Sequence, residues 1–483
     1  MTSLFGTLGV SLSGLNSTQK LLSTTTRNVA NAQTVGYVKK QQQLLTNFAT
    51  GGVKTSDVLR YVDEGYQFKL RTNRGQLTYQ ATLSDKMSGL DGLAGDPTKG
   101  TTVASKMEAL AKAFQELTTR PTDSTVAQQI IDRANDLADS FNDQFTAIEK
   151  MRRDTALQIE DTVSEVNLKL REISDLNRKV LEANSMGTDS TDLQDARDRA
   201  VTDLSGMIDV RAFIDDRGVL NVYSGTYKFL AGEYAEVLSV DPTTSDLVGV
   251  NGYIGPAGGK LGGLQSFIKE EAPRYMMQLS EITKKVARTF ATTLDLDLFI
   301  DEATGAPPTT GNAPYDTPDY FAGNIRVNPA YNSSNPASWE ALRVGDTIAN
   351  TSAGLDSQPQ DIQNAQTIQD WLLNGTLTFD TTYTTSGTSP YTLSSNIAGT
   401  RTIRDAASTM TVRTAQVVSR SESKAKELTT YDTQFQQALA STSEVNIDEE
   451  FQQIITLQNL YQANARVVQT TQALLDELIN LVR

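Results

Sequence analysis

The last part of the sequence carries an apolar side chain at every seventh position. The central row of this repeat runs through Ile454, Tyr461, Val468 and Leu475. Two flanking rows run through Phe451, Ala465 and Ile479, and through Leu460, Val467 and Leu474. A period of seven predicts a helix that packs lengthwise against other helices. Three rows form a face wider than one neighbouring helix can cover, so we expect this helix to contact more than one partner.

The beginning of the sequence carries a narrower row with the same spacing, which predicts a helix over residues 3–30. That row consists of Leu8, Leu15, Leu22 and Val29. The stretch NVANAQTVGY then interrupts the pattern. Asn31 can close a helix in a left-handed conformation, Thr34 favours extended backbone, and Gly36 permits a positive φ ahead of the amphipathic Tyr37. We therefore expect the helix to end here and the chain to change direction.

After this turn, Gln41–Phe48 is expected to continue as helix, and residues 51–61 to form an extended arm. Helical spacing returns from Asp63 and continues, with interruptions, to Ile208. The stretch TRPTD (119–123) interrupts it, with Asp123 or Ser124 as the cap of the next helix. Within that helix a heptad repeat places Ile159, Val166, Ile173 and Val180 on one face.

The pattern changes at residue 209. Val210, Ala212 and Ile214 alternate with other residues, DDRG supplies a turn, and VLNVY (219–223) runs back, which predicts a β-hairpin. The glycine-rich stretch GPAGGKLGG (255–263) is expected to lead into a helix from Leu264 to about Leu298. Helix is predicted again from about residue 400 to residue 440.

We therefore predict a mainly α protein with a β-rich insertion. Terminal coiled-coil helices, residues 1–60 and 441–483, form an inner assembly core. We predict that the interface with neighbouring subunits consists of the narrow row on the first helix and the central row on the last: Leu8, Leu15, Leu22, Val29, Ile454, Tyr461, Val468 and Leu475. A helical-bundle stalk, residues 61–208 and 400–440, carries an outer β-rich domain, residues 209–399. This nested order brings the two ends of the chain together.

The chemistry open to this sequence is narrow, because it contains no cysteine and no histidine. Thiolate and imidazole catalysis and the common zinc sites are therefore excluded. GGKLGG lacks the glycine and hydroxyl positions of a phosphate loop, and the charges of DLQDARDRAVTD (192–203) fit pairs along a solvated helix face. We expect no catalytic residue, no cofactor site and no metal site.

Charge and hydropathy argue against two classes of partner. The net charge is −15, with no basic run, so nucleic acid and anionic lipid are poor partners. No apolar stretch is long enough to span a membrane. We expect the chain to bind other proteins, and no nucleic acid or membrane.

Both ends of the sequence resemble the axial proteins of the bacterial flagellum, a family that forms its rod, hook and hook–filament junction. NVANAQTVGY matches that family's motif at the end of the first helix, through Asn28, Asn31, Thr34, Gly36 and Tyr37. Residues 445–481, with YQANA at 461–465, look like the family's C-terminal helix.

The middle resembles the hook–filament junction members, through 120–142, 192–210, 258–264 and 322–330. The resemblance implies a secreted structural protein, in a ring of about eleven subunits on a helical lattice. It implies a mechanical adaptor and a platform for filament assembly. The implied partners are other copies, the hook protein, a second junction protein and an export chaperone on the C-terminal helix. Two alternatives stay open: a hook or distal rod subunit, whose sequence would become β-rich sooner, and a secreted effector.

Overall fold

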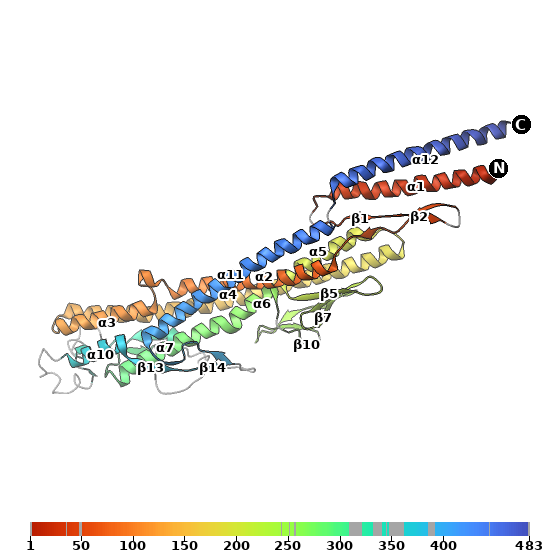
Figure 1. The fold of residues 1–483 in the computed structure, drawn as a ribbon. Helices are drawn as coiled ribbons and strands as arrows, with labels where there is room; N and C mark the ends of the chain where they lie inside the picture. The colour runs from red at the N-terminus through yellow and green to blue at the C-terminus, as the bar shows by residue number, and fades with distance from the viewer. Residues whose placement is uncertain are drawn as a thin grey trace.

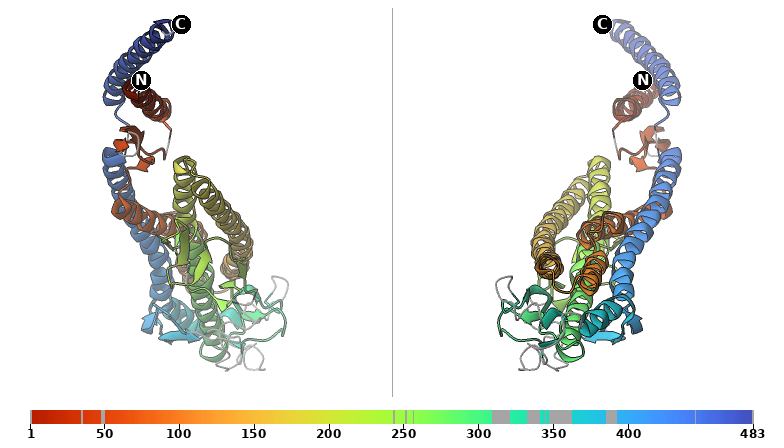
Figure 2. Two further views of the ribbon diagram at one scale, coloured as in Figure 1. Left: turned by 90° about the vertical axis from the view of Figure 1, so that its right-hand side faces the viewer. Right: turned by 90° about the vertical axis from the view of Figure 1, so that its left-hand side faces the viewer.

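The structure is a computed structural model of the 483-residue chain. It describes residues 2–34, 36–47, 51–242, 244–250, 252–255, 257–308, 321–331, 341–343, 345–346, 362–384, 392–443 and 445–481. The molecule is long and narrow, and both chain ends lie at one tip (Figure 1). Figure 2 shows the terminal helices leaving the rest of the molecule at that end, side by side.

Helices make up most of the described chain. They are α1 (Thr2–Asn31), α2 (Glu64–Ala94), α3 (Val103–Thr119), α4 (Ser124–Ser185), α5 (Thr191–Met207), α6 (Gly259–Ser266), α7 (Ala272–Thr292), α10 (Gln363–Asn374), α11 (Ile403–Ser443) and α12 (Ile447–Leu481). Short 3₁₀ turns lie at Pro97–Lys99 and Phe321–Gly323, and a π-helical turn at Phe267–Glu271 joins α6 to α7.

The strands are short. They are β1 (Lys40–Gln41), β2 (Leu44–Asn47), β3 (Gly52–Thr55), β4 (Leu59–Arg60), β5 (Val210–Ile214), β6 (Leu220–Ser224), β7 (Phe229–Ala231), β8 (Ser239–Val240), β9 (Leu247–Gly249), β10 (Gly252–Tyr253), β11 (Phe299–Asp301), β12 (Ile325–Val327), β13 (Thr376–Phe379), β14 (Thr382–Thr384), β15 (Thr392–Ser394) and β16 (Gly399–Thr402). Every pairing is antiparallel, and each sheet among the described residues has two or three strands. The predicted fold class, a helical stalk that carries a β-containing part, is confirmed.

The stalk is built around α4, whose sequence explains its length. The Asp123 side chain accepts a hydrogen bond from the Thr125 N–H and caps its first turn, as predicted. Its first half contributes to a core shared with α2, α3, α7 and the start of α11. Its second half buries the predicted row Ile159, Val166, Ile173 and Val180. Most of that row packs against α5, α6 and the sheet of β5, β6 and β7.

Among the described residues, most buried side chains of 209–399 share a core with the stalk, and the cluster that lies wholly within this range is small: Met277, Tyr383 and Leu393. The predicted hairpin is present as β5 and β6, with Val210 opposite Ser224 and Ile214 opposite Leu220. However, α7 lies inside the stalk core, so the insertion and the stalk share their buried side chains. The division of the chain at 209 and 399 therefore stays a prediction. The helix expected from Leu264 to Leu298 starts earlier, at Gly259, contains the π-helical turn and stops at Thr292.

One local prediction near the N-terminus is wrong. Gln41–Asn47 forms strand, not helix: β1 pairs with β4, and β2 pairs with β3 across a hairpin. Phe48 lies outside the described residues. Strand is favoured over helix here because the hairpin is held against α1, where the Ser13 hydroxyl accepts a hydrogen bond from the Val53 N–H (3.1 Å). Glycine at position 52 allows this approach, since a Cβ there would lie 2.2 Å from the Ser13 hydroxyl oxygen.

Candidate assembly interface of the terminal helices

The two terminal helices, α1 and α12, pack antiparallel and are called the terminal pair below (Figure 1). Ser17 and Thr24 are buried on α1 and donate hydrogen bonds to the Val53 carbonyl and to Gln42 Oε1. The other buried positions of α1 alternate by three and four residues, the spacing of a coiled-coil seam. These six positions are Ser11, Gly14, Thr18, Leu21, Thr25 and Asn28. Four of the six side chains carry a hydroxyl or an amide and one position is glycine. The face of α1 that meets α12 is therefore small and polar rather than apolar.

The register of the terminal pair follows from two contacts. A Cβ at Gly14 would lie 3.1 Å from the Asn464 amide, and the Asn28 amide bonds to Glu450 (2.9 Å). Midway between these contacts, the antiparallel register brings Leu21 opposite Leu457, and both are buried. A seam with so little apolar surface contributes little hydrophobic stabilisation, at roughly 25 cal/mol per Å².

The predicted interface rows lie on the flanks of this seam. Leu8, Leu15, Leu22 and Val29 on α1 are half-buried. On α12 the residues Ile454, Val468 and Leu475 are half-buried, and Tyr461 is 37% exposed. Their spacing from the buried Glu450, Leu457 and Thr471 places this row beside α1 in the same chain. The first helix therefore already covers part of the row that we assigned to neighbouring subunits.

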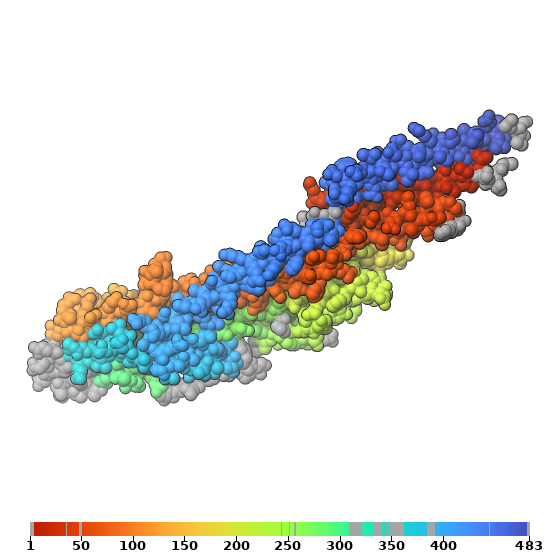
Figure 3. All heavy atoms as spheres, viewed as in Figure 1, coloured from red at the N-terminus to blue at the C-terminus, as the bar shows by residue number. Residues whose placement is uncertain are grey.

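Other apolar side chains of the terminal region are more exposed. They include Phe5 and Leu12 on α1, Leu44 and Leu45 on the β2–β3 hairpin, and Phe451, Ile455, Leu474 and Ile479 on α12. The flanking rows of the C-terminal repeat contain three of these α12 residues, whereas Ile455 and the hairpin leucines have no counterpart in the sequence pattern. Figure 3 shows the terminal pair as a narrow rod with no other part of the chain over its outer side.

The sequence motif at the end of α1 is organised around Asn28, which is almost fully buried. Its Nδ2 donates to the carbonyl oxygen of Lys40 (2.8 Å) and to Glu450 Oε2 (2.9 Å). Its Oδ1 accepts from the Lys40 N–H (3.1 Å) and from the Tyr37 hydroxyl (3.0 Å). One amide therefore holds together the end of α1, the returning chain and the start of α12.

The other motif residues shape the turn. Asn31 closes the helix without a left-handed backbone, contrary to the prediction: its Nδ2 donates to the Arg27 carbonyl (3.0 Å), and its carbonyl accepts from the Thr34 N–H (2.9 Å). Gly36 has φ +76°, and a Cβ there would lie 2.6 Å from the Arg199 side chain. Burial and the nearby Asp195 raise the pKa of the Tyr37 hydroxyl to about 12, so it stays protonated as a donor.

The returning chain is held to the stalk by an acidic row on α5. Arg60 pairs with Asp195 (2.8 Å) and Asp198 (2.6 Å), and the buried Lys40 pairs with Asp192 and Asp195. These acids face another segment, so our interpretation of them as pairs along a solvated helix face is wrong. We use the term joint for the segment Asn28–Lys40 together with Arg60, Glu450 and the acidic row of α5, which consists of Asp192, Asp195 and Asp198.

Burial sets the electrostatics of the joint. It raises the pKa of the Asp195 carboxyl and lowers the pKa of the Lys40 ammonium. A buried charge destabilises the folded state unless it forms an ion pair with a group of opposite charge. The joint is therefore stable only when the end of α1, the strands β1 and β4 and α5 are all in position.

A metal-binding cluster and a membrane-spanning helix are both absent from the described residues. These residues contain no cluster of acidic side chains arranged for a metal ion. None of their helices combines the length and the apolar character needed to cross a bilayer.

Known proteins match the chain at both ends and in the middle. A family model described as the flagellar hook-associated protein FlgK helical domain matches residues 87–307. A second, described as the flagellar basal body rod FlgEFG protein C-terminal, matches residues 435–481. The solved structure of the flagellar hook junction protein FlgK from Burkholderia pseudomallei covers 50% of this chain and 46% of its own, at 22% identity and a TM-score of 0.42.

Curated relatives align over nearly the full length. Flagellar hook-associated protein 1 of Salmonella typhimurium is 21% identical over 546 residues, with 97% of this chain and 98% of that protein covered. Its counterpart in Escherichia coli is 23% identical over 547 residues with the same coverage. The Bacillus subtilis protein is 24% identical over 233 residues, 45% of this chain and 46% of that protein. These matches join both termini to the helical middle, so the chain is similar to flagellar hook-associated protein 1 along nearly its whole length.

Proposed function

We propose that this chain is a structural protein of the bacterial flagellum that forms the junction between hook and filament. The relatives that align along nearly its whole length are named as hook-associated proteins, and none of them is named as an enzyme. The chain would act as a mechanical adaptor between two tubes and as the surface on which the filament is assembled.

The observation that carries this proposal is the way the terminal pair distributes its side chains. Its internal seam is small and polar, while Phe451, Ile455, Leu474 and Ile479 point away from it. Exposed apolar rows of this kind mark an interaction surface. Packing of several copies around a tube would cover them, whereas a single chain has no further helix to place there within its described residues.

The partners follow from this arrangement and from the family. We propose a ring of about eleven copies on a helical lattice, in which terminal pairs line the inside. The hook protein would contact one side of the ring and a second junction protein the other. An export chaperone would hold the apolar rows of α12 in the cytoplasm, before the chain is secreted to the flagellum outside the cell.

A hook or rod subunit is the second candidate, because residues 435–481 match a rod-protein model. That model covers only the C-terminal helix and the residues just before it, which the axial proteins have in common. The stalk distinguishes the candidates: residues 87–307 match the helical domain of a hook-associated protein. The junction is therefore the better-supported position.

Deletion of the gene tests the position directly. We expect hooks without filaments in electron micrographs, with filament protein released into the medium, and normal filaments after complementation. A strain that makes normal filaments without this protein would contradict the junction assignment. A strain that fails to make hooks would favour the rod or hook alternative.

A further inference from the structure

The outer face of the sheet formed by β5, β6 and β7 carries a row of aromatic rings, which we call the aromatic face. Strand alternation turns Val210, Leu220 and Val222 into the core and leaves the rings outside. The row runs through Phe213, Tyr223, Phe229 and Tyr234, with successive ring centroids 6.3, 5.8 and 5.1 Å apart. Phe213 is 52% exposed and Tyr234 is 70% exposed.

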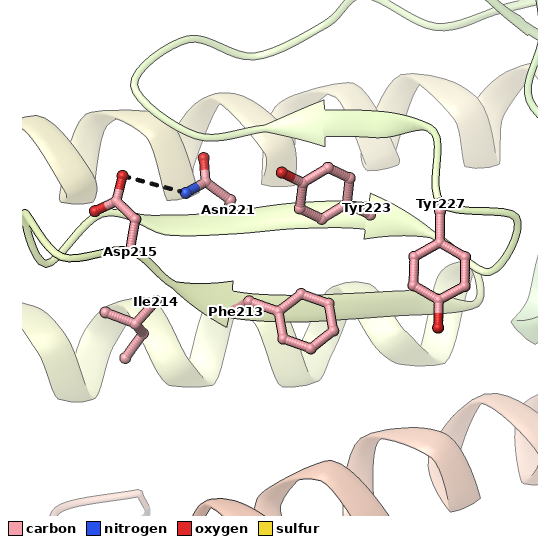
Figure 4. A pocket seen from close by; sticks show the side chains of 6 residues that line it. All are labelled: Phe213, Ile214, Asp215, Asn221, Tyr223 and Tyr227. Atoms are coloured by element: carbon pink, nitrogen blue, oxygen red, sulfur yellow. Dashed lines mark hydrogen bonds between the residues drawn. The ribbon is translucent and has the colours of Figure 1, made fainter.

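An open hollow of about 370 Å³ lies on this face (Figure 4). Phe213, Tyr223 and Tyr227 line it, together with the polar side chains of Asp215 and Asn221. The Arg211 guanidinium lies 4.7 Å from the centre of the Tyr227 ring. Tyrosine, phenylalanine and arginine gathered in this way are typical of the energetic centre of a protein–protein interface.

We propose that the aromatic face binds the α2–α11 face of the next copy of this chain. The inference rests on the proposed function, because it needs copies arranged in a ring. Neighbours in a ring meet head to tail, so two different surfaces of one chain must fit each other. An exposed aromatic patch on one side of the stalk therefore requires a complement on another side.

The complement lies on α2 and α11. Phe68 on α2 is 48% exposed, and Tyr431 on α11 is 42% exposed and stacks on Phe435 (6.3 Å, 22°). The Asn73 amide bonds to the Leu428 carbonyl (2.9 Å), which fixes α2 and α11 in a register that brings Phe68 level with this stack. In the view shared by Figures 1 and 3, the C-terminal half of α11 lies along the upper edge of the molecule, and the β5–β10 region lies along the lower edge.

Charge and area also favour a second copy as the occupant. Residues 209–254, which contain the aromatic face, hold seven acidic and three basic residues. Residues 413–435 of α11, which include Tyr431 and Phe435, hold four basic and three acidic residues, and residues 63–74 beside them hold three basic and two acidic residues. Opposite potentials favour contact between the two faces. An aromatic side chain presents about 150–250 Å². The exposed fractions of Phe213 (52%), Tyr227 (60%) and Tyr234 (70%) therefore supply on the order of 350 Å² of the ~800 Å² that each partner buries in a standard interface.

The lack of natural cysteine permits a clean crosslinking test. Tyr234→Cys, Tyr431→Cys and the double variant would be expressed in the deletion strain, and isolated flagella treated with a short bismaleimide. We expect a ladder of dimers and larger species with the double variant and only monomer with either single variant. Gln115→Cys combined with Tyr431→Cys is the matched control, because Gln115 is exposed on α3 at the far end of the stalk.

Immunogold labelling of the same flagella separates the outcomes, and circular dichroism of each variant checks its fold. Labelled junctions without a ladder would overturn this inference while leaving the proposed function intact. Crosslinks from Tyr234→Cys to a different protein, or an equal ladder in the control pair, would also overturn it. Absence of label from the junction would overturn the proposed function and this inference with it.

Discussion

Replacement of Asn28 by alanine tests the central claim about the joint. This side chain makes four hydrogen bonds and is only 1% exposed. The Tyr37 hydroxyl is half-buried and can turn to water, and Glu450 keeps its ion pair with Lys39 (3.1 Å). The N–H and the carbonyl of Lys40 have no such alternative, because Lys40 is 2% exposed.

The expected magnitude follows from those two stranded groups. A buried polar group left without a partner costs about 1–3 kcal/mol, so the two groups stranded by Asn28→Ala should weaken the closed joint by about 2–6 kcal/mol. At 1.4 kcal/mol per factor of ten, the open form becomes roughly 30- to 20,000-fold more populated. Asn28→Asp should destabilise the closed joint more than Asn28→Ala does at pH 7, because it places a second carboxylate beside Glu450. The stability of this variant's joint should rise as the pH falls and the new carboxylate gains a proton.

Hydrogen exchange measured by mass spectrometry on the full-length chain is the assay. Peptides that cover residues 36–47 should exchange faster in Asn28→Ala by the factor above, while peptides from the stalk core at 126–141 should not change. Asn16→Ala, an exposed asparagine on the same helix, is the control. The reasoning would be refuted by equal exchange in the two variants, or by unprotected amides at 36–47 in the unaltered chain.

Three further changes have defined outcomes. Leu474→Asp should prevent incorporation into flagella and leave the melting temperature unchanged, because Leu474 is 54% exposed in the single chain. The control is Gln472→Asp at an exposed neighbouring position, and equal incorporation of the two variants would contradict this prediction. Gly36→Ala should lower the melting temperature, since positive φ and the crowded site together cost about 1–3 kcal/mol; an unchanged melting curve would rule out the strain. Burial alone would raise the pKa of Glu271, but hydrogen bonding and charge from two arginines lower it below its usual 4.5. The stabilisation by Glu271 is therefore present above pH 4.5 and is lost as the pH falls through the lowered pKa. Glu271→Gln should lower the melting temperature at pH 7, and the difference from the unaltered chain should shrink in acid. A difference in melting temperature that does not depend on pH would contradict this prediction.

The sequence predicts those parts of the fold that local pattern determines. The heptad of Ile159 to Val180 is buried as expected, and the cap at Asp123 begins a helix, because each depends only on residues within a few turns. The hairpin of β5 and β6 follows from alternation around a turn for the same reason. In each case the neighbours that matter are close in the chain.

The candidate site is harder to predict, because it joins distant residues. A search for apolar periodicity passes over Ser11, Gly14 and Thr18, whose small size lets two helices approach closely. Asp195 has possible partners one turn away on its own helix, yet it pairs with Arg60, 135 positions earlier in the chain. Neither a seam of small residues nor an ion pair between distant segments can be recognised from the spacing of apolar or charged residues along the sequence.

The joint has a mechanical consequence. The chain passes from the terminal pair to the stalk between α1 and α2 and returns between α11 and α12, and the Lys39 N–H fastens one passage to the other by donating to the Ser443 carbonyl (2.8 Å). A single passage would act as a swivel, about which the outer part could spin. Two passages fastened together act as a hinge, which yields to bending and resists twist. A subunit at the meeting point of two tubes of different stiffness would therefore transmit torque from its terminal pair to its stalk. The same subunit would still allow the tube to bend.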